Sequence, residues 1–169
     1  MKLTIIKGLL LATLATANFA CKDDLVYSEL VRDNRPAVPV TFPNAQTFGG
    51  NPWIEVSAAG GGAIKFDLSI PASSGRTIKE ITTVAGGATG INVGSLNSAA
   101  AKFNTRAIPG SGTTASFTTT LTAFKTRFPA VNITPSTPTL LREIAFIFLI
   151  TLDDNTQIVT QQVRVRINP

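Results

Sequence analysis

Two segments of the chain alternate apolar and polar residues with a period of two, and this constrains the fold more than any other feature. The segment 63–71 (AIKFDLSIP) turns Ile64, Phe66, Leu68 and Ile70 to one side. The segment 161–168 (QQVRVRIN) does the same with Val163, Val165 and Ile167. This is the pattern of a strand with one buried face, and it does not suit a helix. The sequence therefore predicts a β-sheet domain with a core on one side of these strands.

A third segment, 142–152 (REIAFIFLITL), is apolar at both parities. Such a strand lies centrally in a sheet or has its second face covered. The residues that follow it, 153–157 (DDNTQ), favour a hairpin turn, because Asp and Asn tolerate left-handed backbone and bond locally. The turn offers too few oxygen ligands for calcium, and we expect no metal here.

Weaker strand patterns lie between Gly and Pro breakers. They cover 41–48, 52–58, 77–85, 90–96 and 114–124. Two short helical alternatives remain open, at 97–103 and at 121–129.

These patterns together predict an all-β fold, a single antiparallel β-sandwich over residues 38–169, with a small barrel as the alternative. In strand number and size the domain resembles an immunoglobulin or fibronectin type III domain. It lacks the Cys…Trp…Cys framework of true immunoglobulin domains. It also lacks their tyrosine corner, because the only tyrosine, Tyr27, precedes the domain. The resemblance is one of architecture.

Residues 1–20 have the pattern of a signal peptide: a short basic start, an apolar stretch over 8–17 and a small residue, Ala20, at the cleavage point. Cys21, the only cysteine of the chain, follows directly. This arrangement resembles a bacterial lipoprotein signal, which implies that Cys21 is acylated and anchors the chain through residues 21–37 as a tether. The sequence departs from that pattern at Asn18, where an aliphatic residue is usual. The alternative is a buried free cysteine after a conventional signal.

Lys22, Asp23 and Asp24 follow the cysteine and resemble the export tag of surface lipoproteins of the Bacteroidetes type. The resemblance implies a lipid-anchored protein of the outer membrane that faces the outside of the cell. If these residues are an ordinary linker, the domain faces the periplasm.

Catalytic chemistry has few candidates in this sequence. The chain contains no histidine, which excludes Ser-His-Asp and Cys-His nucleophiles and His-ligated zinc. The carboxylates Glu55, Asp67 and Glu143 fall on or beside alternating strands, where a solvated face is expected. Basic residues are scattered, so we expect no nucleic-acid partner. Because catalytic candidates are few, we expect no enzymatic activity, and we expect no cofactor.

Trp53 is the one candidate ligand-binding residue, because a lone Trp near a Gly-rich loop can stack on a sugar ring. The alternative is a core or edge tryptophan in a strand. Arg164 and Arg166 share one side of the last strand, where a charged face discourages aggregation.

The function expected from these features is that of a non-enzymatic outer-membrane lipoprotein, acting as a cell-surface interaction or accessory binding module. The lipoprotein resemblance implies an association with nutrient uptake, with an outer-membrane transporter, another lipoprotein or a polysaccharide as partner. The alternative is a carbohydrate-binding domain presented at the cell surface.

Overall fold

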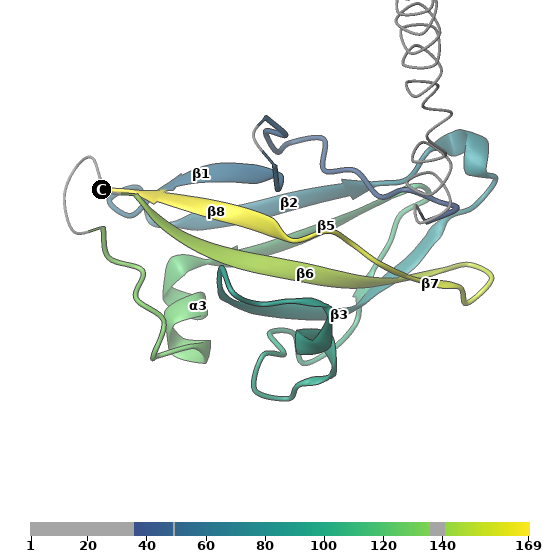
Figure 1. Cartoon of the computed structure of the whole chain (residues 1–169). Coiled ribbons are helices and arrows are strands. Elements are labelled where there is room, and N and C mark those ends of the chain that lie inside the picture. Colours follow the sequence, from purple (N-terminus) through teal and green to yellow (C-terminus); the bar gives the residue numbers. More distant parts are fainter. Residues whose placement is uncertain (1–35, 49, 136–140) are drawn as a thin grey trace, which may run out of the picture. The chain divides into compact units, whose positions relative to one another are not determined.

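The computed structural model describes residues 36–48, 50–135 and 141–169 (Figure 1). The strands are β1 (Trp53–Ser57), β2 (Ala63–Ser69), β3 (Ile78–Ala88), β4 (Ile108–Pro109), β5 (Thr114–Thr120), β6 (Arg142–Leu152), β7 (Gln157–Val159) and β8 (Val163–Asn168). The helices are the 3-10 turns η1 (Ala72–Ser74) and η2 (Val93–Asn97) and the short α3 (Leu121–Arg127). The described part of the chain is thus mostly β, as expected.

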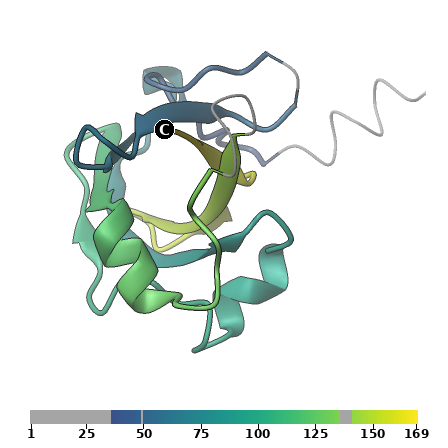
Figure 2. The ribbon, with the colours of Figure 1, turned by 90° about the vertical axis from the view of Figure 1, so that its left-hand side faces the viewer.

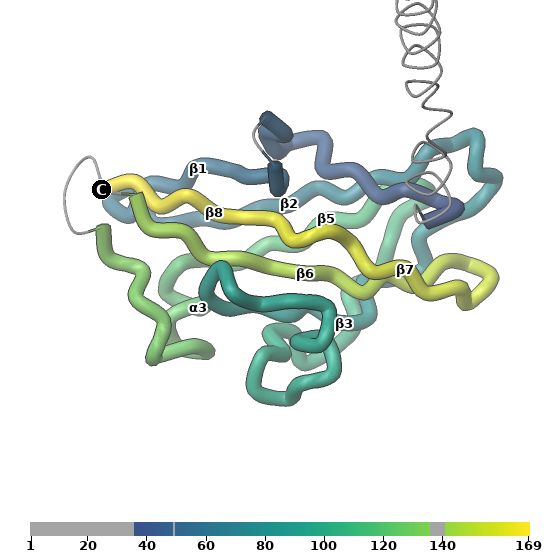
Figure 3. Tube along the Cα trace, viewed as in Figure 1, coloured from purple at the N-terminus to yellow at the C-terminus, as the bar shows by residue number. Residues whose placement is uncertain are grey.

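The strands form a larger, curled sheet and a separate pair. Within the described residues the larger sheet has the order β1-β8-β6-β3-β4, and β7 also pairs with β6, while β2 pairs with β5. Figure 3 shows β7 and β8 following one another along β6. Seen end-on in Figure 2, the strands curl around a common interior.

The expectation of a wholly antiparallel fold is wrong at one pair, since β1 runs parallel to β8. A hairpin forces two strands to be antiparallel, but no hairpin joins these two. Asn51 beside β1 and Gln162 beside β8 are 111 residues apart and hydrogen-bonded. The direction of β1 is therefore set by packing, which no local pattern encodes.

The strict alternation in β2 and β8 is confirmed. Every apolar side chain named for these two segments is buried, and the core contains them all. The prediction that the strand at 142–152 lies centrally in a sheet is confirmed as well, because β6 lies between β8 and β3. Its Ile144, Phe146 and Phe148 enter the core, while Ala145 and Ile147 are buried on the opposite side of the strand. η2 packs against β3 and β6.

Phenylalanine rings join the β2–β5 pair to the larger sheet. The rings of Phe66 on β2 and Phe146 on β6 have centroids 6.1 Å apart, and those of Phe117 on β5 and Phe148 on β6 are 5.4 Å apart. Edge-on and tilted contacts of this kind add to the area that the rings bury. The core therefore lies between the pair and the sheet.

Two of the weaker strand predictions are wrong. Residues 41–48 form only isolated bridges, at Thr41 and Gln46. Residues 90–96 contain η2, because the Asn92 side chain accepts a bond from the Gly94 N–H while the Asn92 N–H bonds the Ser95 hydroxyl, a capping box.

A third prediction is right only in its first half. β5 ends at Thr120, whose hydroxyl accepts the Ala123 N–H and starts α3. The helical alternative for 121–129 thus holds for Leu121–Arg127. At the hairpin, the turn after β6 is confirmed, with Asn155 at φ 64°.

Two asparagine side chains stand in for missing strands at sheet edges. Asn44 accepts the Asp67 N–H at 2.9 Å and donates to the Lys65 carbonyl at 2.8 Å on β2. Asn104 accepts the Val84 N–H at 2.7 Å and donates to the Thr82 carbonyl at 3.2 Å on β3. In both places one amide pairs the N–H of a residue and the carbonyl two residues earlier, so these two backbone groups are not left unpaired at the edge.

The predicted signal peptide and nearly all of the predicted tether fall in residues 1–35, which lie outside the described residues. Cys21, Lys22, Asp23 and Asp24 are among them. Their predicted roles stay predictions.

Candidate functional site

The candidate site is the outer face of three neighbouring strands, β1, β8 and β6. In the register of these strands Trp53 lies opposite Arg164, and Glu55 lies opposite Arg166. On the other side of β8, Glu143 of β6 is also paired with Arg166. Because alternate residues share a face, these side chains gather on the side of the sheet away from the core. We call this surface the outer face.

Glu143 bridges the two arginines of β8. Its two carboxylate oxygens accept from Arg164 Nη1 at 2.8 Å and from Arg166 Nε at 2.9 Å. The arginine side chains are 33% and 32% exposed, and that of Glu143 is 24% exposed. Charge-assisted bonds at such short distances fix all three side chains in one arrangement.

Arg166 also covers Trp53. Its guanidinium carbon lies 3.8 Å from the centre of the Trp53 ring, a cation–π stack. Trp53 is only 9% exposed, and its indole N–H donates to the Phe48 carbonyl at 3.4 Å. A sugar ring could stack on Trp53 only after Arg166 had moved away.

Phe48, in the loop that precedes β1, is an exposed aromatic residue, with 91% of its surface accessible to solvent. Sequence reasoning missed it, because a continuous strand over 41–48 would put Phe48 on the same side as the buried Phe42. The chain instead makes its last bridge at Gln46. A Phe directly before two glycines is the signal that would have marked it.

Amide side chains extend the outer face beyond β8. Gln162 accepts from Asn51 Nδ2 and from Arg164 Nε, both at 3.2 Å. Its amide nitrogen donates to the carbonyls of Thr89 and Ile91, at 3.0 and 2.9 Å. Gln162 therefore ties the loop after β3 and the loop before β1 to the arginine row.

A hollow of about 740 Å³ borders the outer face at Glu143. Its other lining residues are Ala88, Thr89, Ala130, Val131, Asn132, Leu141 and Arg142. Glu143 thus belongs both to the arginine bridge and to the wall of this hollow.

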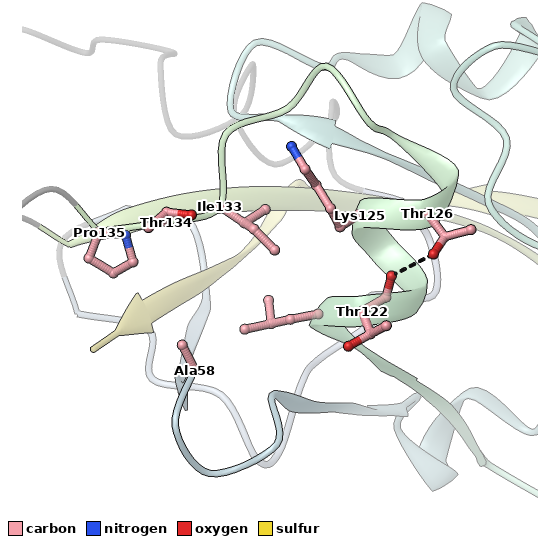
Figure 4. Close-up of a pocket in the computed structure, with 8 residues that line it drawn as sticks. Ala58, Thr122, Lys125, Thr126, Ile133, Thr134 and Pro135 are labelled. Atoms are coloured by element: carbon pink, nitrogen blue, oxygen red, sulfur yellow. Dashed lines mark hydrogen bonds between the residues drawn. The ribbon is translucent and has the colours of Figure 1, made fainter.

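A groove of about 450 Å³ lies beside α3 (Figure 4). Ala58, Leu121, Ile133 and Pro135 supply its apolar lining, and Thr122, Thr126, Thr134 and Lys125 the rest. The Lys125 ammonium donates to the carbonyls of Pro129 and Val131 at 2.7 and 2.8 Å, so it holds the following loop. The Thr126 hydroxyl donates to the Thr122 carbonyl at 3.0 Å. The groove therefore offers apolar contact and little polar chemistry.

Two carboxylates elsewhere in the domain have lowered pKa values. A hydrogen bond from the Ser116 hydroxyl, 2.5 Å long, and one from Lys65 lower the pKa of Asp67. Hydrogen bonds from Thr156 and the nearby Arg76 lower the pKa of Asp154. A lowered pKa keeps a carboxylate ionised, whereas a general acid needs a raised one.

Over residues 36–48, 50–135 and 141–169, no group of three or more His, Cys, Asp or Glu side chains is placed to hold a metal ion. In the same part of the chain no helix has the length and apolar character needed to cross a bilayer.

The structure thus brings the predicted Trp53 together with Arg164 and Arg166, and it adds Glu143, Gln162, Asn51 and Phe48 to them. In comparisons with known proteins, no family model, curated protein or solved structure matches this chain.

Proposed function

We propose that this chain is a non-enzymatic outer-membrane lipoprotein, anchored by lipid on Cys21 and displayed at the cell surface as an interaction or accessory binding module. The observation that carries the binding role is the outer face, where Glu143 and Trp53 hold Arg166 in place beside an exposed Phe48. Side chains fixed before binding lose little entropy when a partner arrives. The predicted signal peptide, Cys21 and the export tag Lys22, Asp23 and Asp24 support the proposed location at the cell surface.

The finer architecture that we propose is an immunoglobulin-like sandwich. The packing of the β2–β5 pair on the larger sheet supports two layers around one core. The parallel pairing of β1 with β8 is a local departure from that plan.

A role without catalysis is supported by the state of the carboxylates. Glu143 is engaged by two guanidinium groups, and Asp67 and Asp154 have lowered pKa values. With lowered pKa values, neither Asp67 nor Asp154 is poised to donate a proton near neutral pH.

Fractionation of the native host tests the anchor. We expect Cys21→Ala to move the protein from the membrane to soluble fractions, because the acyl chains that hold it are then absent. A matched variant, Asp23→Ala with Asp24→Ala, should stay in the membrane but lose accessibility to protease added to intact cells. Membrane retention of Cys21→Ala would refute the anchor, and unchanged accessibility of the double variant would refute the tag.

Surface crosslinking on intact cells, with recovery through a tag after Pro169, tests the accessory role. Recovery of an outer-membrane transporter or a neighbouring lipoprotein supports an accessory subunit of uptake machinery. Recovery of the chain alone, from cells on which it is surface-labelled, counts against that role.

A further inference from the structure

The charges of the outer face are balanced. Arg164 and Arg166 carry two positive charges, while Glu143, bonded to both, and Glu55, opposite Arg166, carry two negative ones. An ionic ligand would gain attraction from one pair of groups and lose it to the other. The balance therefore favours a neutral ligand that both donates and accepts hydrogen bonds.

Atoms free to make such bonds remain on fixed side chains. Arg166 uses Nε for Glu143 and one side of its plane for Trp53, and among the described residues its two terminal nitrogens have no partner. In the same part of the chain Arg164 Nη2, Asn51 Oδ1 and Glu55 Oε1 also have none. The face thus offers both donors and acceptors, as the hydroxyls of a sugar require.

Phe48 supplies an exposed aromatic ring from the loop before β1. Its carbonyl is bonded to the Trp53 indole, so its backbone lies at the edge of the Arg166–Trp53 stack. Of the other large apolar residues that are exposed in the described part of the chain, Val93 (59%) is in η2, and Leu141 (40%) precedes β6 and lines the hollow at Glu143. Phe48 is thus the exposed aromatic ring among them, and an aromatic ring suits the C–H face of a sugar.

We infer that the outer face binds a neutral glycan, with Phe48 stacked on a sugar ring and Arg166, Arg164, Asn51 and Glu55 bonded to hydroxyls. The inference rests on the binding role proposed above and names its ligand. It moves the stacking residue from Trp53 to Phe48, since Trp53 is covered by Arg166.

Affinity electrophoresis tests this inference on the exported full chain carrying Cys21→Ala. The native gels contain one neutral polysaccharide each (β-glucan, galactomannan, xylan or mannan) or the acidic polygalacturonate. We expect retardation in at least one neutral gel and none in polygalacturonate. Phe48→Ala should weaken that affinity about tenfold, the loss of one aromatic contact of ~1.4 kcal/mol. Arg166→Ala should weaken it too, and Phe48→Trp should retain it.

Val93→Ala is the matched control, because it also removes an exposed apolar side chain, on η2, but none of the groups proposed to contact the glycan. Equal loss of affinity in Val93→Ala and Phe48→Ala would overturn the inference. So would retardation in polygalacturonate alone, or mobility unchanged in every gel. The gel assay does not depend on where the protein resides in the cell, so its outcome and that of the fractionation can be read separately.

Discussion

Two aromatic residues five positions apart, Phe48 and Trp53, have opposite surroundings. Trp53 begins β1 and is covered by Arg166, whereas Phe48 is almost fully exposed. The sequence marks both as aromatic residues beside a glycine-rich loop. It does not show which is covered, because Arg166 belongs to a strand more than 100 residues later, and its position depends on the pairing of β1 with β8.

Truncating these two residues should therefore have very different effects on stability. Trp53→Ala removes a buried ring and should lower the free energy of unfolding by about 3 kcal/mol or more. Phe48→Ala removes a ring that solvent already surrounds, and its effect should stay within about 0.5 kcal/mol. Urea denaturation of both variants measures the difference, and equal losses would contradict the packing of Trp53.

Asp67 should show its dependence on Ser116 in a pH titration. Removing the hydroxyl with Ser116→Ala takes away the largest cause of the lowered pKa, so the pKa of Asp67 should rise toward its ordinary value near 3.8. A depressed folded-state pKa adds stability that is present above the unfolded pKa and is lost as the pH falls through the folded one. Ser116→Ala should therefore lose stability at neutral pH and show a weaker dependence of stability on pH in the acid range.

NMR titration of the Asp67 carboxyl measures the first effect, with Asp154 as the internal reference. Its pKa is lowered by Thr156 and Arg76 and should not respond to Ser116→Ala. An unchanged Asp67 pKa in the variant would contradict the role given to the hydroxyl.

At the level of elements, the sequence predicted what local pattern determines. Strands β2, β6 and β8 follow from their alternation or their apolar length, and the turn after β6 from Asp153, Asp154 and Asn155. Two of the failures occur where a side chain competes with strand backbone. Asn92 turns 90–96 into a 3-10 helix, and Thr120 ends β5 and caps α3. Such competition depends on single hydrogen bonds that no periodicity reports.

The two edge asparagines allow a matched test of this competition. Asn104→Ala leaves the N–H of the fully buried Val84 without a partner, which should cost about 1–3 kcal/mol. Asn44→Ala removes the partner of the Asp67 N–H and the Lys65 carbonyl on β2. These two groups are near solvent, so water can replace the Asn44 amide. We expect a clearly smaller loss there. Urea denaturation compares the two, and faster amide exchange at Val84 in Asn104→Ala would locate the effect.

For the whole molecule, stability depends on the contact between the β2–β5 pair and the larger sheet. A pair of strands such as β2 and β5 is marginal by itself in water, and here Phe66 and Phe117 attach it to Phe146 and Phe148. The composition indicates enough apolar residues for a core, but the pattern does not say which strands face each other. That arrangement becomes visible only in three dimensions.

Phe117→Ala should therefore weaken the domain as one unit. The free energy of unfolding should fall by about 3–5 kcal/mol, because the Phe117 ring is buried and joins the β2–β5 pair to Phe146 of the larger sheet. Amides of β2 and of β6 should lose protection in the same transition, which hydrogen exchange at increasing urea concentration measures. Loss of β2 protection at clearly lower urea than that of β6 would contradict this, because the β2–β5 pair and the larger sheet would then unfold separately.

The parallel pair of β1 and β8 also has a consequence in time. Of the strands that the structure describes, β8 is the last along the chain, yet it lies between β1 and β6. At ~5–20 residues per second, synthesis takes roughly 5–20 s to cover the 111 residues between Asn51 and Gln162. During that delay β1 has no partner and the larger sheet is split. The larger sheet therefore acquires β1 only after β8 has been made, so the joining of its earliest and latest described strands is a late step of folding during synthesis.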